Sequence, residues 1–131
     1  MSAVRLLSWS IHEAIDYLAG VFLILAPFIF GFREGVAFPV FVAVGVLFLV
    51  NAVLTPGPFG VVSIVPVPVH AGVDYALAFL LILAPFVFGF TATDAALLSS
   101  MFLGLALLVL TLITAFPMKE GVEPQPPVTE P

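Results

Sequence analysis

The sequence predicts an all-α membrane protein whose four transmembrane helices form two parallel, tandem two-helix hairpins. Hydrophobic residues make up 63% of the 131 positions and charged residues only 8%, whereas soluble globular domains carry roughly 25% charged residues. Four apolar stretches, each poor in charge, are close to the roughly 20 residues that a membrane-spanning helix needs. Isolated strands are excluded, because in lipid they would leave their backbone polar groups unpaired.

An internal repeat organises the four spans into two pairs. The segment 12–32 recurs as the segment 70–90, at an offset of 58 residues. Further along, the match weakens and slips by one residue, so that Thr55 pairs with Thr114. Because each copy contains an even number of spans, both copies enter the membrane from the same side, and the repeats are parallel.

The spans have recognisable ends. The first opens at Ser10 with Glu13 three residues later, which is the pattern of a capping box. The third begins near Pro68, since proline is favoured in the first turn of a helix. The spans are predicted at about 10–32, 36–54, 68–90 and 94–116. The chain is thus divided into an N-terminal segment, repeat 1, an apolar proline-containing linker, repeat 2 and a disordered acidic tail: residues 1–9, 10–58, 59–67, 68–117 and 118–131.

Pro27 and Pro85 lie late in the first and third spans. Each removes the hydrogen bond to the carbonyl four residues earlier, so we expect a kink or a broken last turn in both repeats. Gly31 and Gly89 follow, and glycine allows the chain to leave a helix with a positive φ angle.

Polar side chains gather at the end of the bundle where the odd spans begin. Residues four apart share a helix face, so His12 pairs with Asp16 and His70 with Asp74. The even spans return to this depth near their ends. The predicted polar layer contains His12, Asp16, Tyr17, Asn51, His70, Asp74, Tyr75 and Thr111. Ionisable residues within spans are costly and suggest function, although hydrogen bonds between helices also simply help them to associate.

Three interpretations of this layer remain open. The plainest is a polar clasp that joins the two repeats. In the second, His12 and His70 ligate a haem, or bind a divalent metal together with carboxylates such as Asp16, Asp74 and Glu13. The third is a small transporter or ion pathway that uses Asp16 and Asp74. No metal motif of specific spacing is present, so no metal is assigned and a cofactor is not required.

The order of these motifs resembles the SPW (Ser-Pro-Trp) repeat family of small integral membrane proteins. Its pattern is a helix start that contains Asp, an apolar run, the tripeptide followed by an aliphatic residue and Gly-Phe, and a second apolar helix. The tripeptide appears here as Ala26-Pro27-Phe28 and as Ala84-Pro85-Phe86, with the proline retained. The resemblance implies repeated two-helix units in the membrane and no established activity.

We therefore expect a non-catalytic protein that contacts lipid and either self-associates or serves as an accessory subunit of a membrane complex. No nucleophile with a base and no phosphate-binding loop is present, and the chain has no cysteine. Nucleic-acid binding has no support, because the net charge is -5. We expect a prokaryotic inner or plasma membrane. Arg5 and Lys119 against Arg33 favour cytoplasmic termini by two to one.

Overall fold

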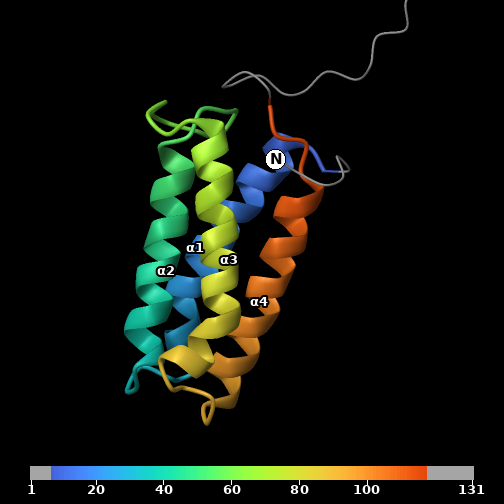
Figure 1. The fold of residues 1–131 in the computed structure, drawn as a ribbon. Coiled ribbons are helices and arrows are strands. Elements are labelled where there is room, and N and C mark those ends of the chain that lie inside the picture. Colours follow the sequence, from blue (N-terminus) through green and yellow to red (C-terminus); the bar gives the residue numbers. More distant parts are fainter. Residues whose placement is uncertain (1–6, 118–131) are drawn as a thin grey trace, which may run out of the picture.

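The computed structural model describes residues 7–117, and within this range the chain forms four helices and no strand. They are α1 (Trp9–Ile29), α2 (Ala37–Val53), α3 (Val67–Val87) and α4 (Asp94–Ile113). The helices run side by side as a bundle, with the hairpin loops 30–36 and 88–93 at one end (Figure 1). The predictions for the tail 118–131, like those that rest on Arg5 and Lys119, lie outside the described residues.

Three of the four described helices are long and apolar enough to cross a membrane. By length and composition α1, α3 and α4, with 21, 21 and 20 residues, qualify as spans. The apolar helix α2 is shorter, with 17 residues, which is at the lower limit of about 17 residues for a spanning helix. The predicted fold class is confirmed: α1 packs on α2 and α3 packs on α4, so the four helices make two hairpins.

Glycines let the two helices of each hairpin approach closely. A Cβ atom on Gly45 of α2 would lie 2.8 Å from the carbonyl oxygen of Gly20 on α1, and one on Gly104 of α4 would lie 2.8 Å from that of Ala78 on α3. Such separations are too short for a carbon and an oxygen that are not bonded. Small residues at helix contacts are the usual means of close packing in membranes, and both repeats use them at corresponding positions.

The N-cap of the first helix lies two residues earlier than predicted. Its N-cap is Ser8, whose hydroxyl accepts a hydrogen bond from the backbone N–H of Ile11 at 3.3 Å. The capping box predicted at Ser10 is therefore wrong. Instead, Oε2 of Glu13 accepts a hydrogen bond from the backbone N–H of Phe59 in the linker, at 3.1 Å.

The odd helices end in the same way in both repeats. Each helix stops two residues after Pro27 or Pro85, which is three residues short of the predicted end. The glycines that follow have positive φ angles, 73° at Gly31 and 75° at Gly89, as expected for residues that turn the chain out of a helix. Each helix continues through its proline and ends with the backbone N–H of Phe30 or Phe88 donating to the carbonyl oxygen of Ala26 or Ala84.

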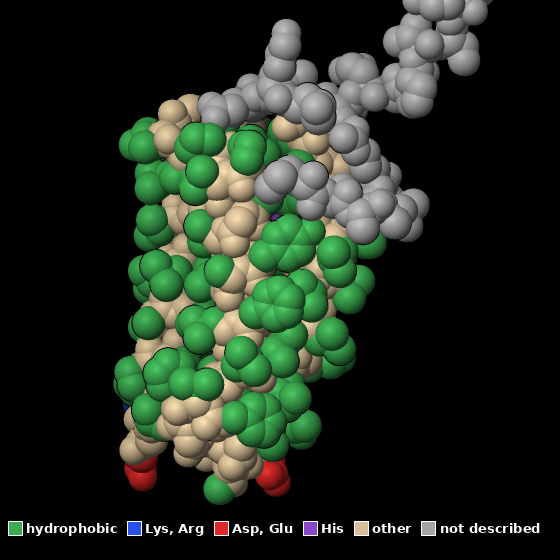
Figure 2. Space-filling view, in the orientation of Figure 1, with side chains coloured by type: hydrophobic (Ala, Val, Ile, Leu, Met, Phe, Trp, Pro, Cys, Tyr) green, Lys and Arg blue, Asp and Glu red, His purple; other side chains and the backbone are tan. Residues whose placement is uncertain are grey.

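The surface in view is covered by apolar side chains along the length of the helices (Figure 2). Phe102 is 77% exposed and Leu18 is 68% exposed. Large apolar side chains also fill the interior, among them Leu23, Phe41 and Leu81, which are fully buried. An apolar exterior around an apolar interior is the arrangement of a protein whose solvent is lipid, so these helices contact the membrane directly.

Candidate functional site

The candidate site lies near the ends of the helices that face the chain termini. α1 and α3 supply its histidines and aspartates, and they meet across the bundle with α2 and α4 on either side (Figure 1). His12 and His70 occur in the first turn of their helices, and Asp16 and Asp74 lie one turn further in. The polar groups therefore sit inside the bundle.

The four side chains form a closed ring in which nitrogen and oxygen alternate. Nε2 of His12 lies 3.1 Å from Oδ2 of Asp16 and 2.6 Å from Oδ2 of Asp74. Nε2 of His70 lies 3.0 Å from each of the same two oxygens. All four side chains are at least 98% buried. Each imidazole thus touches the carboxylate of its own helix and that of the opposite repeat.

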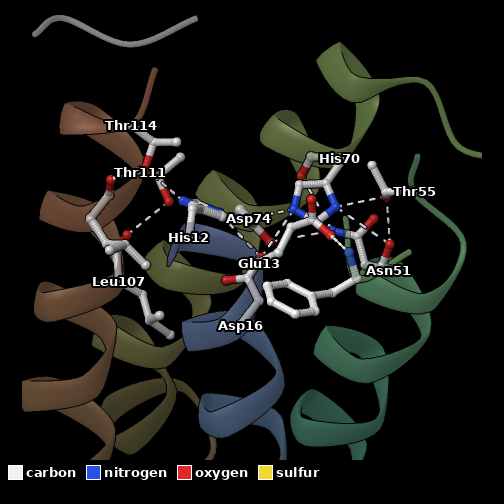
Figure 3. A network of polar contacts seen from close by, with 12 residues as sticks. His12, Glu13, Asp16, Asn51, Thr55, His70, Asp74, Leu107, Thr111 and Thr114 are labelled. Atoms are coloured by element: carbon white, nitrogen blue, oxygen red, sulfur yellow. Dashed lines mark hydrogen bonds and ion pairs between the residues drawn. The ribbon is translucent and has the colours of Figure 1, made fainter. Parts of the chain in front are cut away.

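Threonines hold the outer edge of each imidazole (Figure 3). Nδ1 of His12 lies 2.7 Å from Oγ1 of Thr114, and Nδ1 of His70 lies 2.8 Å from Oγ1 of Thr55. Each threonine hydroxyl donates its proton to the carbonyl four residues earlier, at 2.6 and 2.5 Å. Its oxygen can therefore only accept from the imidazole, which means that Nδ1 carries a proton in both histidines. Nε2 is left to face the carboxylates.

The two halves of the site differ at one position. Nδ2 of Asn51 donates to Oδ1 of Asp74 at 3.2 Å and to the backbone carbonyl of His70 at 3.3 Å. By the alignment of Thr55 with Thr114, the corresponding residue in repeat 2 is Leu110, which has no donor. Oδ1 of Asp16 is accordingly buried without a hydrogen-bond partner in the described part of the chain.

An apolar lid closes the ring on the side of the termini. Trp9 stacks on His12 at 5.5 Å between ring centroids and meets His70 edge-on at 5.1 Å. Phe116 lies 5.2 Å from His12. Val67 and Ala71 complete a small buried cluster with Trp9 and Phe116. The polar ring is therefore shielded from the nearby end of the bundle.

Two residues of the predicted polar layer, Tyr17 and Thr111, make hydrogen bonds outside the ring. The Tyr17 hydroxyl donates to the carbonyl of Phe59 at 2.7 Å, so Tyr17 fastens the linker. Tyr75 is half-buried. Thr111 donates to the carbonyl of Leu107 at 2.8 Å and makes no other hydrogen bond among the described residues. Of the predicted set, His12, Asp16, His70 and Asp74 form the ring, and Asn51 contacts it directly.

Sequence reasoning missed the threonines that do contact the histidines. Thr111 was predicted in place of Thr114, which lies three residues further on. A signal was present, because the repeat alignment pairs Thr114 with Thr55 and both follow an even helix. Trp9 was missed as well. Its contacts with both histidines depend on how the two repeats pack together, and no sequence pattern indicates this.

The geometry limits the chemistry that this site can perform. The carboxylates of Asp16 and Asp74 occupy the space between the two Nε2 atoms, so a haem does not fit between His12 and His70. From the tyrosines that follow the ring to the loops at the far end, the described helices carry no ionisable residue. Neither the haem nor the ion-path interpretation gains support from the structure.

Comparison with curated proteins returns no match, and comparison with solved structures returns none either. A family match does exist: residues 8–114 match the SPW repeat domain. This range spans all four helices, and it includes the ring of two histidines and two aspartates with both of its threonines. The resemblance expected from the sequence is thereby confirmed, and the chain belongs to the SPW repeat family of membrane proteins.

Proposed function

We propose that this protein is a non-catalytic membrane component in which the buried polar ring locks two hairpins into one unit that makes lateral contacts with other membrane proteins. Those contacts are with further copies of the chain or with a larger membrane complex. The observation that carries the proposal is that the hydrogen bonds of the ring run between the repeats. His12 contacts Asp74 and Thr114, and His70 contacts Asp16 and Thr55.

Apolar packing joins the hairpins less closely than it joins the helices within them. A groove of about 480 Å³ lies between α1 and α4, lined by side chains that include Phe22 and Phe102. A second groove, of about 290 Å³, lies between α2 and α3 and includes Val40 and Leu80. The polar ring is therefore well placed to hold the hairpins together where the lipid-facing grooves separate them.

A catalytic role finds no support in the ring itself. Both imidazoles are engaged on both nitrogens, and the lid of Trp9 and Phe116 covers the side nearest the termini. A bundle of this size with an apolar exterior has most of its area available for contact with other membrane helices. A rigid accessory unit uses that surface, and it needs no substrate pocket.

Mass measurement in a mild detergent tests the proposal. The chain has a mass of 13.9 kDa, and we expect the purified particle to contain either several copies or a second membrane protein in fixed ratio. A single copy that purifies without a partner, and that stays single when the detergent is exchanged for lipid nanodiscs, contradicts the proposal.

We further propose that the ring lies toward the cytoplasmic face of a prokaryotic plasma membrane. The chain has no cysteine, so single cysteines can report orientation without a background. Gly35→Cys lies in a loop at the far end with open space around its Cβ position, and Val61→Cys lies in the linker, where the side chain is 75% exposed. An impermeant thiol reagent added to whole cells should label the first variant and spare the second; the reverse pattern refutes this orientation.

A further inference from the structure

We propose that the ring of His12, Asp16, His70 and Asp74 is a closed binding site for one divalent transition-metal ion, with zinc as the best match. This inference goes beyond the lateral role proposed above and does not depend on it. Imidazole nitrogen and carboxylate oxygen are both established zinc ligands, and two of each make up a four-coordinate set. The chain offers no thiolate in their place, since it has no cysteine.

The distances suit a four-coordinate ion. One ligand atom from each residue lies within 4.8 Å of all the others. The four nitrogen–oxygen edges of the ring measure 2.6, 3.0, 3.0 and 3.1 Å. A tetrahedral ion with bonds of about 2.0–2.1 Å needs edges of about 3.3 Å. The four edges of the ring would therefore lengthen by about 0.2–0.7 Å to hold the ion at its centre.

The charge of the ring also calls for a cation. Since the threonines accept the Nδ1 protons, each Nε2 points a lone pair at two carboxylate oxygens unless something positive lies between them. Either a proton on each Nε2 or one divalent ion between the four atoms removes this repulsion. Two neutral imidazoles, two carboxylates and one divalent ion sum to zero, which is the favourable total for a buried site.

The threonines orient the histidines as partners of metal ligands do. A ligating histidine almost always donates its second ring N–H to a fixed acceptor, and that hydrogen bond sets the tautomer and the direction of the ring. Thr114 and Thr55 take this role at 2.7 and 2.8 Å. Because each hydroxyl is itself tied to a helix carbonyl, the acceptor cannot turn away.

The unpaired oxygen of Asp16 is an independent observation that points to a ligand. Its Oδ1 is buried without a hydrogen bond among the described residues, although the matching oxygen of Asp74 receives one from Asn51. A buried carboxylate oxygen without a partner is costly and calls for an explanation. An ion bound at Oδ2 would neutralise the charge of this carboxylate, which lowers the cost of leaving Oδ1 without a hydrogen bond.

Such an ion would be structural. Four protein ligands leave no open position for substrate, and the lid covers the ring. Each histidine and aspartate pair comes from one repeat, so the ion would join the two hairpins and its binding free energy would add to the stability of the folded bundle.

Metal analysis of the full-length chain tests the site. The protein is expressed with added zinc chloride, purified in a mild detergent and measured by elemental analysis; a second sample is treated with a chelator and then titrated with zinc or cobalt chloride. We expect one equivalent of zinc per chain, visible absorption bands of four-coordinate cobalt, and a rise in the unfolding temperature when zinc is restored.

Variants separate this site from surface binding and from misfolding. His70→Gln should abolish uptake of the stoichiometric ion, whereas Asp94→Asn, at an exposed acid on the opposite end of the bundle, should leave it unchanged. Thr114→Val retains all four ligands and should weaken zinc affinity by about 10–100-fold, the usual effect of losing the partner of a ligand. Folding of each variant is checked by its helical circular dichroism and its elution volume.

A wild-type chain that holds no zinc after expression, takes up neither metal, and unfolds at the same temperature with and without zinc overturns the proposal. In that case, protons on the Nε2 atoms, rather than a metal ion, would hold the histidines and carboxylates together. It would not affect the lateral role, which is judged from the particle mass. Uptake that survives in a folded His70→Gln variant at one equivalent would equally refute the assignment of these ligands.

Discussion

Replacing Thr114 by valine removes the hydrogen bond on the outer edge of one imidazole, together with the bond from the hydroxyl to the carbonyl oxygen of Leu110. Oγ1 of Thr114 lies 2.7 Å from Nδ1 of His12, and both residues are fully buried. Valine has nearly the same shape as threonine, so the variant leaves no cavity. The Nδ1–H of His12 loses its acceptor in a place that water does not reach. An unsatisfied buried donor costs about 1–3 kcal/mol, and we expect the free energy of unfolding to fall by that amount.

Thr111→Val is the matched control for this variant. Thr111 is also buried near the end of α4, and its hydroxyl also donates to the carbonyl four residues earlier, at 2.8 Å. It has no hydrogen bond to a histidine. Both variants therefore lose the same bond to the helix backbone, and the difference between them isolates the hydrogen bond to the imidazole.

Thr55→Val should have a smaller effect than Thr114→Val. Nδ1 of His70 has a second, longer contact to the carbonyl oxygen of Asn51 at 3.4 Å, so it retains a weak acceptor when the hydroxyl is removed. Reversible unfolding in mixed micelles, with chelator present throughout to exclude metal, measures all three variants. Equal stabilities of Thr114→Val and Thr111→Val, within about 0.5 kcal/mol, would refute the assigned role of the threonine, since that is the size expected of a neutral substitution.

Three further predictions concern packing, the ring and the linker. Gly104→Ala should destabilise the bundle relative to Gly72→Ala by about 1–3 kcal/mol, because only the first Cβ meets a neighbouring helix; equal unfolding free energies would contradict this. Asp74→Asn should cost more than Asp16→Asn, by about 1–3 kcal/mol. The single oxygen of an amide at position 74 can face Asn51 or the histidines but not both, whereas at position 16 the amide nitrogen can replace the oxygen that has no partner among the described residues. The opposite order in the same assay would count against the asymmetry of the ring. Tyr17→Phe should speed hydrogen exchange in the linker and leave exchange in α4 unchanged, as measured by mass spectrometry; unaltered exchange in the linker would show that the tyrosine does not hold it.

The helices themselves could be predicted from the sequence because their causes are local. Runs of apolar residues of spanning length, and prolines followed by glycines, act over a few neighbours in the chain. The ends of α1 and α3 accordingly repeat the same geometry at Gly31 and Gly89, as predicted. The N-cap of α1 was misplaced by two residues, because Ser8 and Ser10 are both plausible caps and the Glu13 carboxylate accepts a backbone N–H of the linker instead.

The sequence by itself determined the membrane fold, the two hairpins, and the pairing of each histidine with an aspartate four residues later, since helical periodicity alone places those side chains on one face. Only the tertiary structure decided that the pairs close into a ring, because contacts between residues 62 and 102 positions apart depend on how one hairpin docks on the other. The same docking decided that Thr114 rather than Thr111 meets His12, and it left one oxygen of Asp16 without a partner. Patterns within one helix hold no information about the direction from which another helix approaches.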